Sequence, residues 1–507
     1  MSRVIVVGNG PVGQTCALLL ARWGVPVLLL DRRPHREPVG SKAICQQRDV
    51  LDIWDSVGAG RQIAEEGVTW RTNRTFHRDA ELFAVTLPET PGAAFPPFVN
   101  ISQSRTEQIL DERIAAQPLI DVRWGHEVTG ISESGTVSCA QGTFEADYVV
   151  LCSGGHSEAL RRSLGISFGG QVFDDRFLIC DIRTDLPGWA SERRFYFDPS
   201  WNPGRQVLIH PCPGSTFRID WQVPGDYDLA AEEAGGHLDR RIRAIIGDKD
   251  YTIEWKSVYR FSSQVASRMR AGRVLLAGDA AHLYAPFGAR GLNSGVADAE
   301  NAAWKIAFVL NGWAGEALPE SYNDERHAAA LENLDVTSAT MRFLVPQDAT
   351  QAEYRRAVLD EARIPEVDSG RLAEPFWYAR SPLTTPDPSR PLSARPPRGE
   401  LPVPAPGTLV PDVVTPLGRL RALARDGFLL LTSENSPVFE PCPPPVRVVP
   451  MTRDLAAALA ARPGEAWLIR PDAHVAAVLP TPARGDLDVA VRRACGYSRP
   501  RTIVGSK

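Results

Sequence analysis

The sequence predicts an α/β fold with a parallel sheet built from distant segments, an inserted antiparallel sheet and a smaller C-terminal α/β region. Residues 3–31 read as a strand, a glycine-rich turn, a helix and a second strand. Further buried-strand signals lie at residues 148–151 and 273–277, each followed by small residues and a helical stretch. Between about residues 170 and 262 the apolar residues instead recur with period two. The unit that contains the parallel sheet is therefore expected to be discontinuous in the sequence.

Composition excludes several classes of function. Of 507 residues, 43% are hydrophobic and 23% charged, with a net charge of −5, which is ordinary for a globular protein. No basic block or long apolar run occurs, so neither nucleic acid nor a membrane is expected as a partner. The glycine turn begins so early that residues 1–7 are needed as a strand, which predicts a cytoplasmic protein without a signal peptide. Eight cysteines lack CxxC or metal-ligand spacing, which predicts reduced thiols and no metal.

The first motif is the turn between the first strand and its helix. Gly8 is expected to make the tight turn, Gly10 to let the backbone approach a pyrophosphate, and Gly13 to let the helix sit close to the sheet. Pro11 and Val12 open that helix, whose N-terminus faces the phosphates. The acid that ends the second strand should accept hydrogen bonds from ribose hydroxyls. That acid is Asp31, with Arg32 beside it as a further contact.

The inserted region contains the clearest strand of the chain, at residues 217–223. Its apolar residues alternate strictly, so Phe217, Ile219, Trp221 and Val223 should share one face, as either core or pocket lining. Helical spacing follows at residues 298–310 and 320–344. A proline-rich stretch at 381–406 then marks a boundary, and the last hundred residues return to short strands and helices.

The second motif joins a strand end to a long helix. Asp279 follows the strand at 273–277, and residues 286–295 form a glycine-bracketed helix start. An acid at a strand end followed by a glycine-bracketed helix start suits a ligand with a polyol chain and an anionic group.

Together the two motifs resemble the fingerprints of the class A flavoprotein aromatic hydroxylases, over about residues 1–400. The closest likeness is to the branch of 3-(3-hydroxyphenyl)propionate hydroxylase and the polyketide-tailoring hydroxylases. Many of these end in a redox-inactive thioredoxin-like domain, and residues 468–475 resemble its most recognisable strand turn. The resemblance implies FAD bound to a Rossmann-like domain at 1–175 and 266–395, with 70–100 joining a substrate sheet at 176–265. It also implies a thioredoxin-like domain without CxxC at 400–507.

The resemblance also assigns cofactor contacts. Asp279 would bind the ribityl hydroxyls, on the loop that continues through Pro286 and Gly288. The backbone at the helix start would stabilise negative charge on the reduced flavin ring. The residues so implied are Gly291, Leu292 and Asn293 at the helix start, Lys42 and Arg48 near the pyrophosphate or ribityl, Gln103 at the flavin side and Val128 at adenine. For Arg48, a solvated helix face is an equal alternative.

One expected motif is altered. Where the family has Cys-Asp-Gly-Ala-Arg-Ser, linked to FAD and NAD(P)H binding, the chain reads Cys-Ser-Gly-Gly-His-Ser at 152–157. The acid and the arginine are absent, and one residue is inserted before Arg161 and Arg162. The change concerns reduction by the nicotinamide cofactor more than FAD binding.

The resemblance implies that NAD(P)H reduces FAD, that O2 gives a flavin C4a-hydroperoxide, and that an aromatic, phenol-like or polycyclic substrate attacks it. Pocket candidates are Trp221, for which packing is the favoured alternative, Tyr284, Pro286 and His210. His210 and His282 are also candidates for proton handling, with a structural role favoured for His282.

Two alternatives stay open: a flavin oxidase, epoxidase or Baeyer–Villiger enzyme on the same scaffold, and a non-catalytic flavin-binding protein. Proline and Ala/Arg usage, together with the likeness to the tailed hydroxylases, suggests secondary metabolism in a high-GC bacterium. The sequence leaves the oligomeric state open, a homo-oligomer included.

Overall fold

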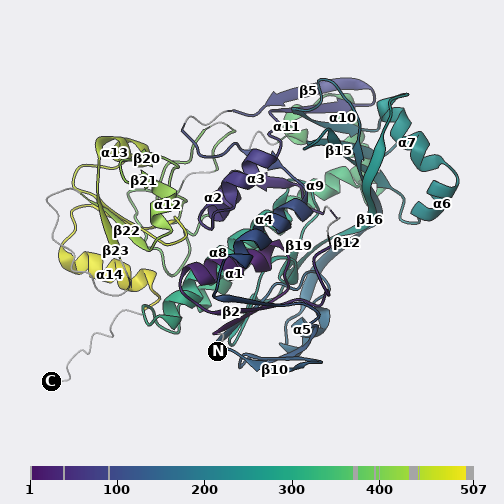
Figure 1. Ribbon diagram of the computed structural model, residues 1–507. Helices are drawn as coiled ribbons and strands as arrows, with labels where there is room; N and C mark the ends of the chain where they lie inside the picture. Colours follow the sequence, from purple (N-terminus) through teal and green to yellow (C-terminus); the bar gives the residue numbers. More distant parts are fainter. Residues whose placement is uncertain are drawn as a thin grey trace.

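The protein has three regions, seen side by side in Figure 1, with the parallel-sheet region between the antiparallel sheet and the C-terminal region. The computed structural model describes residues 3–37, 40, 42–88, 92–368, 375–392, 395–398, 400–432, 444 and 446–497. Within these ranges, every helix is too short or too polar to span a bilayer.

The parallel sheet is assembled from three distant parts of the chain, as predicted. β1 pairs in parallel with β2 and β11, and β11 pairs in parallel with β18. In order the strands are β17 (Arg270–Ala271), β18 (Val274–Leu276), β11 (Tyr148–Leu151), β1 (Val4–Val7), β2 (Val27–Leu30) and β7 (Ile120–Arg123). Strands β1, β2, β11 and β18 are buried throughout, which is why they read as continuous apolar runs.

Two helices of this region, α1 and α8, start at the two glycine motifs. Helix α1 packs along α8, so the two motifs meet in space. The helices between β1 and the C-terminal region are α1 (Pro11–Arg22), α2 (Arg48–Asp55), α3 (Gly60–Glu66), α4 (Gln103–Ala115), α5 (Glu158–Ser163), α6 (Leu229–Ala234), α7 (His237–Ile246), the 3-10 turn η1 (Gly278–Ala280), α8 (Arg290–Leu310), α9 (Glu320–Leu344), α10 (Ala349–Asp360) and α11 (Ile364–Val367).

The second sheet is almost entirely antiparallel. Its strand order is β19 (His282–Leu283), β16 (Thr252–Ala266), β12 (Phe168–Arg183), β15 (Thr216–Val223), β14 (Gln206–Cys212), β13 (Glu192–Phe197), β4 (Thr72–His77) and β5 (Ala80–Thr86). The hairpin of β4 and β5 joins through a parallel pairing with β13. Residues 72–86 therefore pair with the inserted sheet.

Helix α7 covers the outer face of this sheet. The four alternating residues of β15, including Trp221, are buried in one core with Leu238, Ile242 and Ile246 of α7. The prediction that they share a face is confirmed. Trp221 was wrong as a pocket candidate, because α7 seals the face on which it lies and its side chain is fully buried.

Two smaller sheets accompany the parallel sheet. One is formed by β8 (Val128–Ile131), β9 (Thr136–Cys139) and β10 (Gly142–Glu145), and the other pairs β3 (Cys45–Gln47) with β6 (Phe98–Asn100). Seven described cysteines are free; Cys442 lies outside the described residues.

The C-terminal region has a four-stranded sheet in the order β23 (Val446–Pro450), β22 (Phe428–Thr432), β24 (Ala466–Ile469) and β25 (Val475–Leu479). Its other elements are β20 (Val414–Thr415), β21 (Gly418–Arg419), α12 (Leu420–Ala424), α13 (Arg453–Leu459) and α14 (Arg484–Ala494). Trp304 and Phe308 of α8 pack with Phe428 and Leu468 in a shared core. The region is therefore docked on the helix that begins at the second motif.

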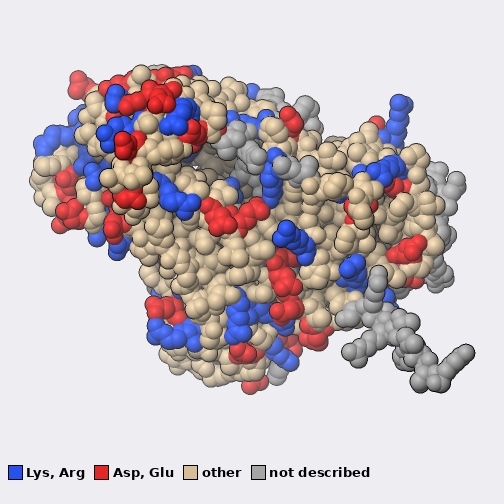
Figure 2. Space-filling model, turned by 180° about the vertical axis from the view of Figure 1, so that it is seen from behind, with Lys and Arg blue, Asp and Glu red and all other residues tan. Residues whose placement is uncertain are grey.

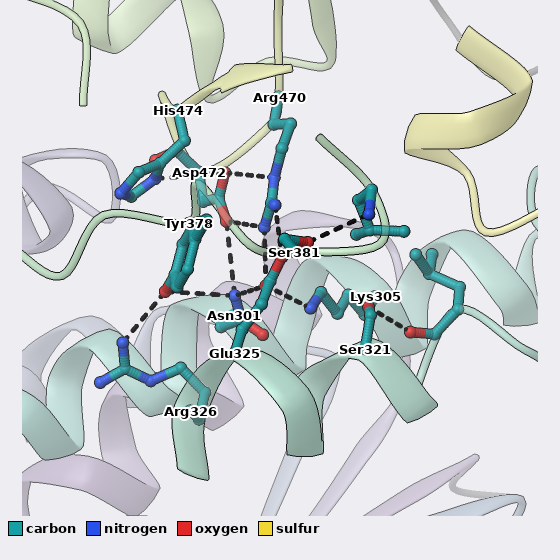
Figure 3. Close-up of polar contacts among 12 residues, drawn as sticks. Asn301, Lys305, Ser321, Glu325, Arg326, Tyr378, Ser381, Arg470, Asp472 and His474 are labelled. Carbon is teal, nitrogen blue, oxygen red and sulfur yellow. Dashed lines mark hydrogen bonds and ion pairs between the residues drawn. The ribbon is translucent and has the colours of Figure 1, made fainter. Parts of the chain in front are cut away.

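A buried ion cluster completes this docking (Figure 3). The guanidinium of Arg470 donates to Glu325 of α9 at 2.5 and 2.9 Å and to Asp472 at 2.6 Å. Lys305 of α8 donates to Glu325 at 2.6 Å, and Trp304 donates to Asp472 at 3.2 Å. Arg470, Lys305, Glu325 and Asp472 are at most 2% exposed. Opposite charges thus compensate one another where water is excluded.

We predict that Arg470→Met destabilises the protein by about 3–5 kcal/mol, because it leaves two buried carboxylates short of a partner. Arg447→Met is the matched control: Arg447 is 45% exposed and lies 3.9 Å from Asp426, so it should cost at most about 1 kcal/mol. Urea unfolding of the two variants measures both values. Equal stability of the two variants would contradict the role given to Arg470.

Candidate functional site

The two glycine motifs pack directly against each other. Gly8 has φ +106°, and a Cβ there would lie 2.4 Å from the Cys152 carbonyl oxygen, while one at Gly13 would lie 1.8 Å from the Gly8 carbonyl oxygen. In the second motif, a Cβ at Gly278 or Gly295 would lie 3.0 or 2.6 Å from a methyl group of Val12. Close backbone packing therefore requires glycine at these positions.

Two other glycines face open space. A Cβ added at Gly10 or Gly291 would meet nothing within 4 Å. Helices α1 and α8 begin at these points, and no side chain caps either one. The first backbone N–H groups of each helix thus remain available to an anion.

Asp279 lies between the two helix starts. Its side chain is exposed, at the turn that follows β18. The charges of His282 and Lys42 act on the Asp279 carboxylate. Lys42, which is exposed, thus lies near Asp279.

Asp298 holds the Asp279 turn in place. It is fully buried on α8 and accepts from the Gly278 backbone at 3.0 Å and from His282 Nε2 at 2.7 Å. Arg326 of α9 donates to its other oxygen at 2.7 Å. Burial alone would raise the pKa of Asp298, but His282 and Arg326 hold it below the ordinary value. His282 therefore has a structural partner, and Asp298 is a site residue to which sequence reasoning gave no role.

The ion cluster of the C-terminal region reaches this carboxylate through Tyr378. Arg326 donates to the Tyr378 hydroxyl at 3.0 Å, and Asn301 donates to the same oxygen at 3.4 Å (Figure 3). Tyr378 in turn packs against His474, with ring centroids 4.4 Å apart. A continuous set of buried contacts joins β24 and its turn to the Asp279 turn.

At the first motif, Asp31 is engaged by its own neighbours. Its carboxylate accepts from the Asn9 backbone at 2.7 Å and from the Arg33 side chain at 3.0 Å. Burial would raise the pKa of Asp31, but these hydrogen bonds hold it below the ordinary value. The adjacent arginine that contacts it is Arg33, whereas Arg32 is exposed. Sequence reasoning missed Arg33, because two consecutive arginines after a strand give no sign of which one turns inward.

The remaining predicted contacts fall in different places. Val128 begins β8, half-buried beside the His126 backbone, which donates to the Asp31 carbonyl. Gln103 opens α4 and accepts from the Ala43 backbone at 3.1 Å, next to Lys42. Arg48 donates to the Phe95 carbonyl at 2.8 Å, and burial and Arg421 lower its pKa. The charges that act on it are Asp49 and Asp52 of its own helix and Arg421 and Asp412 of the C-terminal region, and Asp279 is not among them.

Asn293 ties the start of α8 to β3. Its side chain accepts from the Gln47 backbone at 3.0 Å and donates to the Cys45 carbonyl at 3.0 Å. The side chain is thus a clamp, which leaves the backbone of Gly291 and Leu292 as the groups that face the open space at Gly291.

The altered segment at residues 152–157 has an arginine nearby after all. Arg161, 3% exposed, donates to the Ala280 carbonyl at 3.1 Å and lies over the Phe168 ring at 3.9 Å. It holds the residue that follows Asp279, so a cation supports this turn without the usual motif. His156 is exposed.

The loop of the second motif meets the inner face of the antiparallel sheet, the face opposite α7. Phe287 lies 5.5 Å from Phe177 and 6.4 Å from Phe195, ring to ring, in an aromatic cluster. Pro286 and Gly288 on either side are exposed. Tyr284 is directed to α9, where its hydroxyl donates to the Ala330 carbonyl at 3.3 Å, so it is not a free polar group. The molecule is hollowed beside the antiparallel-sheet lobe (Figure 2), and charges of both signs are interspersed on this face.

These features fit an FAD molecule. The uncapped start of α1 and the open space at Gly10 suit a pyrophosphate, Asp279 suits a polyol, and the start of α8 suits an electron-rich ring edge. The Nδ2 atom of Asn9 and the side-chain amide of Gln46 are buried without hydrogen-bond partners among the described residues, as expected of groups that face a ligand.

Comparison with known proteins agrees with this fit. Residues 1–337 match the family model described as an FAD binding domain. Over 367 residues the chain is 32% identical to a rifampicin monooxygenase of Streptomyces venezuelae, covering 70% of this chain and 74% of the relative. It is 28% identical to a 3-(3-hydroxy-phenyl)propionate/3-hydroxycinnamic acid hydroxylase of a Mycobacterium species, covering 71% of this chain. The chain spans only 63% of the length of that hydroxylase.

Solved structures share the fold over nearly the whole chain. The flavin-dependent monooxygenase PieE, in complex with FAD and substrate, superposes with a TM-score of 0.83 at 23% identity, covering 97% of this chain and 99% of that one. Aklavinone-11 hydroxylase, in a ternary complex with FAD and aklavinone, gives a TM-score of 0.78 at 22% identity, covering 97% of this chain and 99% of that one.

We predict that Gly10→Ala and Gly13→Ala separate cofactor binding from folding. A methyl group at position 10 meets open space in the protein, so the variant should fold normally but lose about tenfold or more in FAD affinity, or about 1.4 kcal/mol. The same methyl at position 13 collides with the Gly8 carbonyl and should destabilise the protein itself. Thermal unfolding without FAD and fluorescence titration with FAD measure the two effects. Unchanged FAD affinity in Gly10→Ala would refute the pyrophosphate assignment.

Proposed function

The chain belongs to the family defined by this FAD binding domain, and we propose that it is an FAD-dependent monooxygenase that hydroxylates an aromatic substrate. One observation carries the proposal: the loop that follows Asp279 packs through Phe287 into an aromatic cluster on the inner face of the antiparallel sheet. Aromatic side chains beside a cofactor site favour a flat, apolar ligand such as a phenol or a polycyclic ring.

Bound FAD supplies the two-electron chemistry and the activation of oxygen. The residues that would hold it are Asp279 with Lys42 at the ribityl chain, the α1 start at the pyrophosphate, and the backbone of Gly291 and Leu292 at the ring. Asp298 fixes the Asp279 turn through Gly278. The Phe177, Phe195 and Phe287 rings, buried together in one cluster, would exclude water from the side of the loop that faces the sheet.

The proposed reductant is NAD(P)H, which would bind transiently at the protein surface. In place of the family's acid and arginine, Arg161 donates to the Ala280 carbonyl at 3.1 Å and to the Gly155 carbonyl at 3.5 Å, so it links the altered segment to the Asp279 turn. The exposed side chain of His156 leaves this edge open to a transient cofactor.

We also propose that the C-terminal region, residues 400–507, is a thioredoxin-like domain. The parallel pair β22 and β23, followed by the antiparallel strands β24 and β25 with a terminal helix, supports this assignment. The accompanying division is an FAD domain at 1–175 and 266–395 and a substrate sheet at 176–265. Lacking CxxC, the C-terminal domain would act through its docking on α8 and α9.

Anaerobic stopped-flow mixing of the FAD-loaded protein with NADH or NADPH tests the function. With a panel of phenols and polycyclic quinols present, we predict that at least one compound accelerates flavin bleaching about tenfold or more, because substrate binding completes the site. The control omits the phenol.

Two outcomes would contradict the proposal. A flavin that never bleaches under any condition indicates a non-catalytic flavin-binding protein. After air is admitted, stoichiometric peroxide with a desaturated product indicates an oxidase.

A further inference from the structure

The inner face of the antiparallel sheet carries a histidine and an aspartate on neighbouring strands. His210 lies on β14 and Asp220 on β15, and their Nε2 and Oδ2 atoms are 3.7 Å apart. Their sequence neighbours Ile209, Ile219 and Trp221 point to the α7 side. Because side chains alternate along a strand, His210 and Asp220 point to the opposite, inner side.

That side faces the cofactor loop. Leu208, directly opposite Asp220 in the sheet register, belongs to the aromatic cluster of Phe287. Arg218, two residues before Asp220 on the same face, donates to the Lys42 carbonyl at 3.0 Å. The histidine and aspartate thus lie between Lys42 on one side and the Phe287 cluster on the other.

Both side chains keep an unused polar atom. The side chains of His210 and Asp220 are 12% and 18% exposed. Their Nδ1 and Oδ1 atoms are buried and have no hydrogen-bond partner among the described residues. A buried polar atom left without a partner is costly. Two of them on one face indicate a polar ligand group that completes their hydrogen bonds.

Charged groups surround the pair. Arg218 is neutralised by Asp181 of β12 at 2.7 Å, and Arg193 of β13 donates to Asn73 of β4 at 3.2 Å. Arg193 and Arg218 both act on His210, Cys45 of β3 interacts with Arg193, and Cys212 of β14 interacts with Arg218 and Asp220.

This environment favours the uncharged forms of both groups. Burial, then Arg193 and Arg218, lowers the pKa of His210 well below its ordinary value. Burial raises the pKa of Asp220 to about 7, against the opposing charges of Arg218 and Arg193. Before substrate arrives, His210 is therefore neutral, and its Nδ1 atom has no hydrogen-bond partner among the described residues.

We propose that His210 and Asp220 form the acid–base pair that ionises an aromatic hydroxyl of the substrate. The O–H bond breaks, the proton passes to the pair, and the phenolate oxygen is stabilised by the positive charge of Arg193 and Arg218. The new negative charge in turn favours the protonated form of His210. This inference rests on the proposed function and narrows its substrate class to arenes that carry an ionisable hydroxyl group.

The test uses FAD-loaded protein without reductant, so that no turnover occurs. 4-Nitrophenol and 7-hydroxycoumarin change their spectra on ionisation, and difference spectra give the ionised fraction of each bound probe across pH. In the wild type the bound probe should ionise at lower pH than in solution. When the probe is bound to His210→Gln, the pKa of the probe should be higher by about one unit or more, which is a tenfold loss of ionisation. His237→Gln, at an exposed histidine on α7, should behave as the wild type does.

The outcomes are distinguishable. If the ionised fraction of the probe bound to His210→Gln equals that of the probe bound to the wild type, the acid–base assignment is overturned. The proposal of monooxygenation is then unaffected. Failure of the wild type to bind any phenol of the panel would count against the proposed function, and the inference would fall with it.

A second variant covers the case in which His210→Gln does not fold. Stability from a carboxyl whose pKa is raised in the folded state is present below the unfolded value of 3.8 and is lost as pH rises through about 7. Asp220→Asn should therefore raise the unfolding temperature at pH 8.5 more than at pH 5.5, while lowering the ionised fraction of bound probe. A loss of stability at both pH values would assign the pair a purely structural role and overturn the proposal.

Discussion

Asp298 accepts hydrogen bonds from three directions at a point that water cannot reach. Through Gly278 it fixes the turn that carries Asp279, through His282 it fixes the strand after that turn, and through Arg326 it is tied to α9. A fully buried carboxylate needs all of these partners, since losing one leaves its charge poorly compensated. The position of the cofactor turn is therefore coupled to the packing of α8 against α9. Because Arg326 also contacts Tyr378, the coupling extends to the C-terminal region.

The two faces of the antiparallel sheet differ: the outer face stabilises the fold, and the inner face is the one proposed to contact substrate. Its outer face is apolar and sealed by α7, which stabilises the sheet as a rigid wall. Its inner face combines an aromatic cluster with unpaired polar atoms and buried arginines, an arrangement that costs stability unless a ligand completes it. The C-terminal region contributes in a third way, by holding α8 and α9 from behind through Arg470 and Asp472. The proposed cofactor site is thus closely packed on the sides that would position FAD and incomplete on the side proposed to face substrate.

Much of the fold could be predicted from the sequence because its signals are local. The buried runs of β1 and β11, the alternation of β15 and the glycines around α1 and α8 each follow from short-range physics. The hydrogen-bond partners could not be predicted in the same way. Which of two adjacent arginines meets Asp31, which face of the sheet carries Trp221, and that Asp298 joins Gly278 to Arg326 all depend on packing between distant segments. His210 was flagged by its chemistry alone, and only the register of β14 and β15 showed which face it occupies and which acid lies beside it.

We propose that this chain places one oxygen atom from O2 on an aromatic ring. Turnover of an accepted phenol under 18O2 with NAD(P)H, followed by mass spectrometry and NMR of the product, tests this proposal. We expect one 18O atom per product molecule, attached at a ring carbon that carried hydrogen in the substrate. A product without 18O, or with the label inserted between a carbonyl carbon and its neighbour, would contradict it.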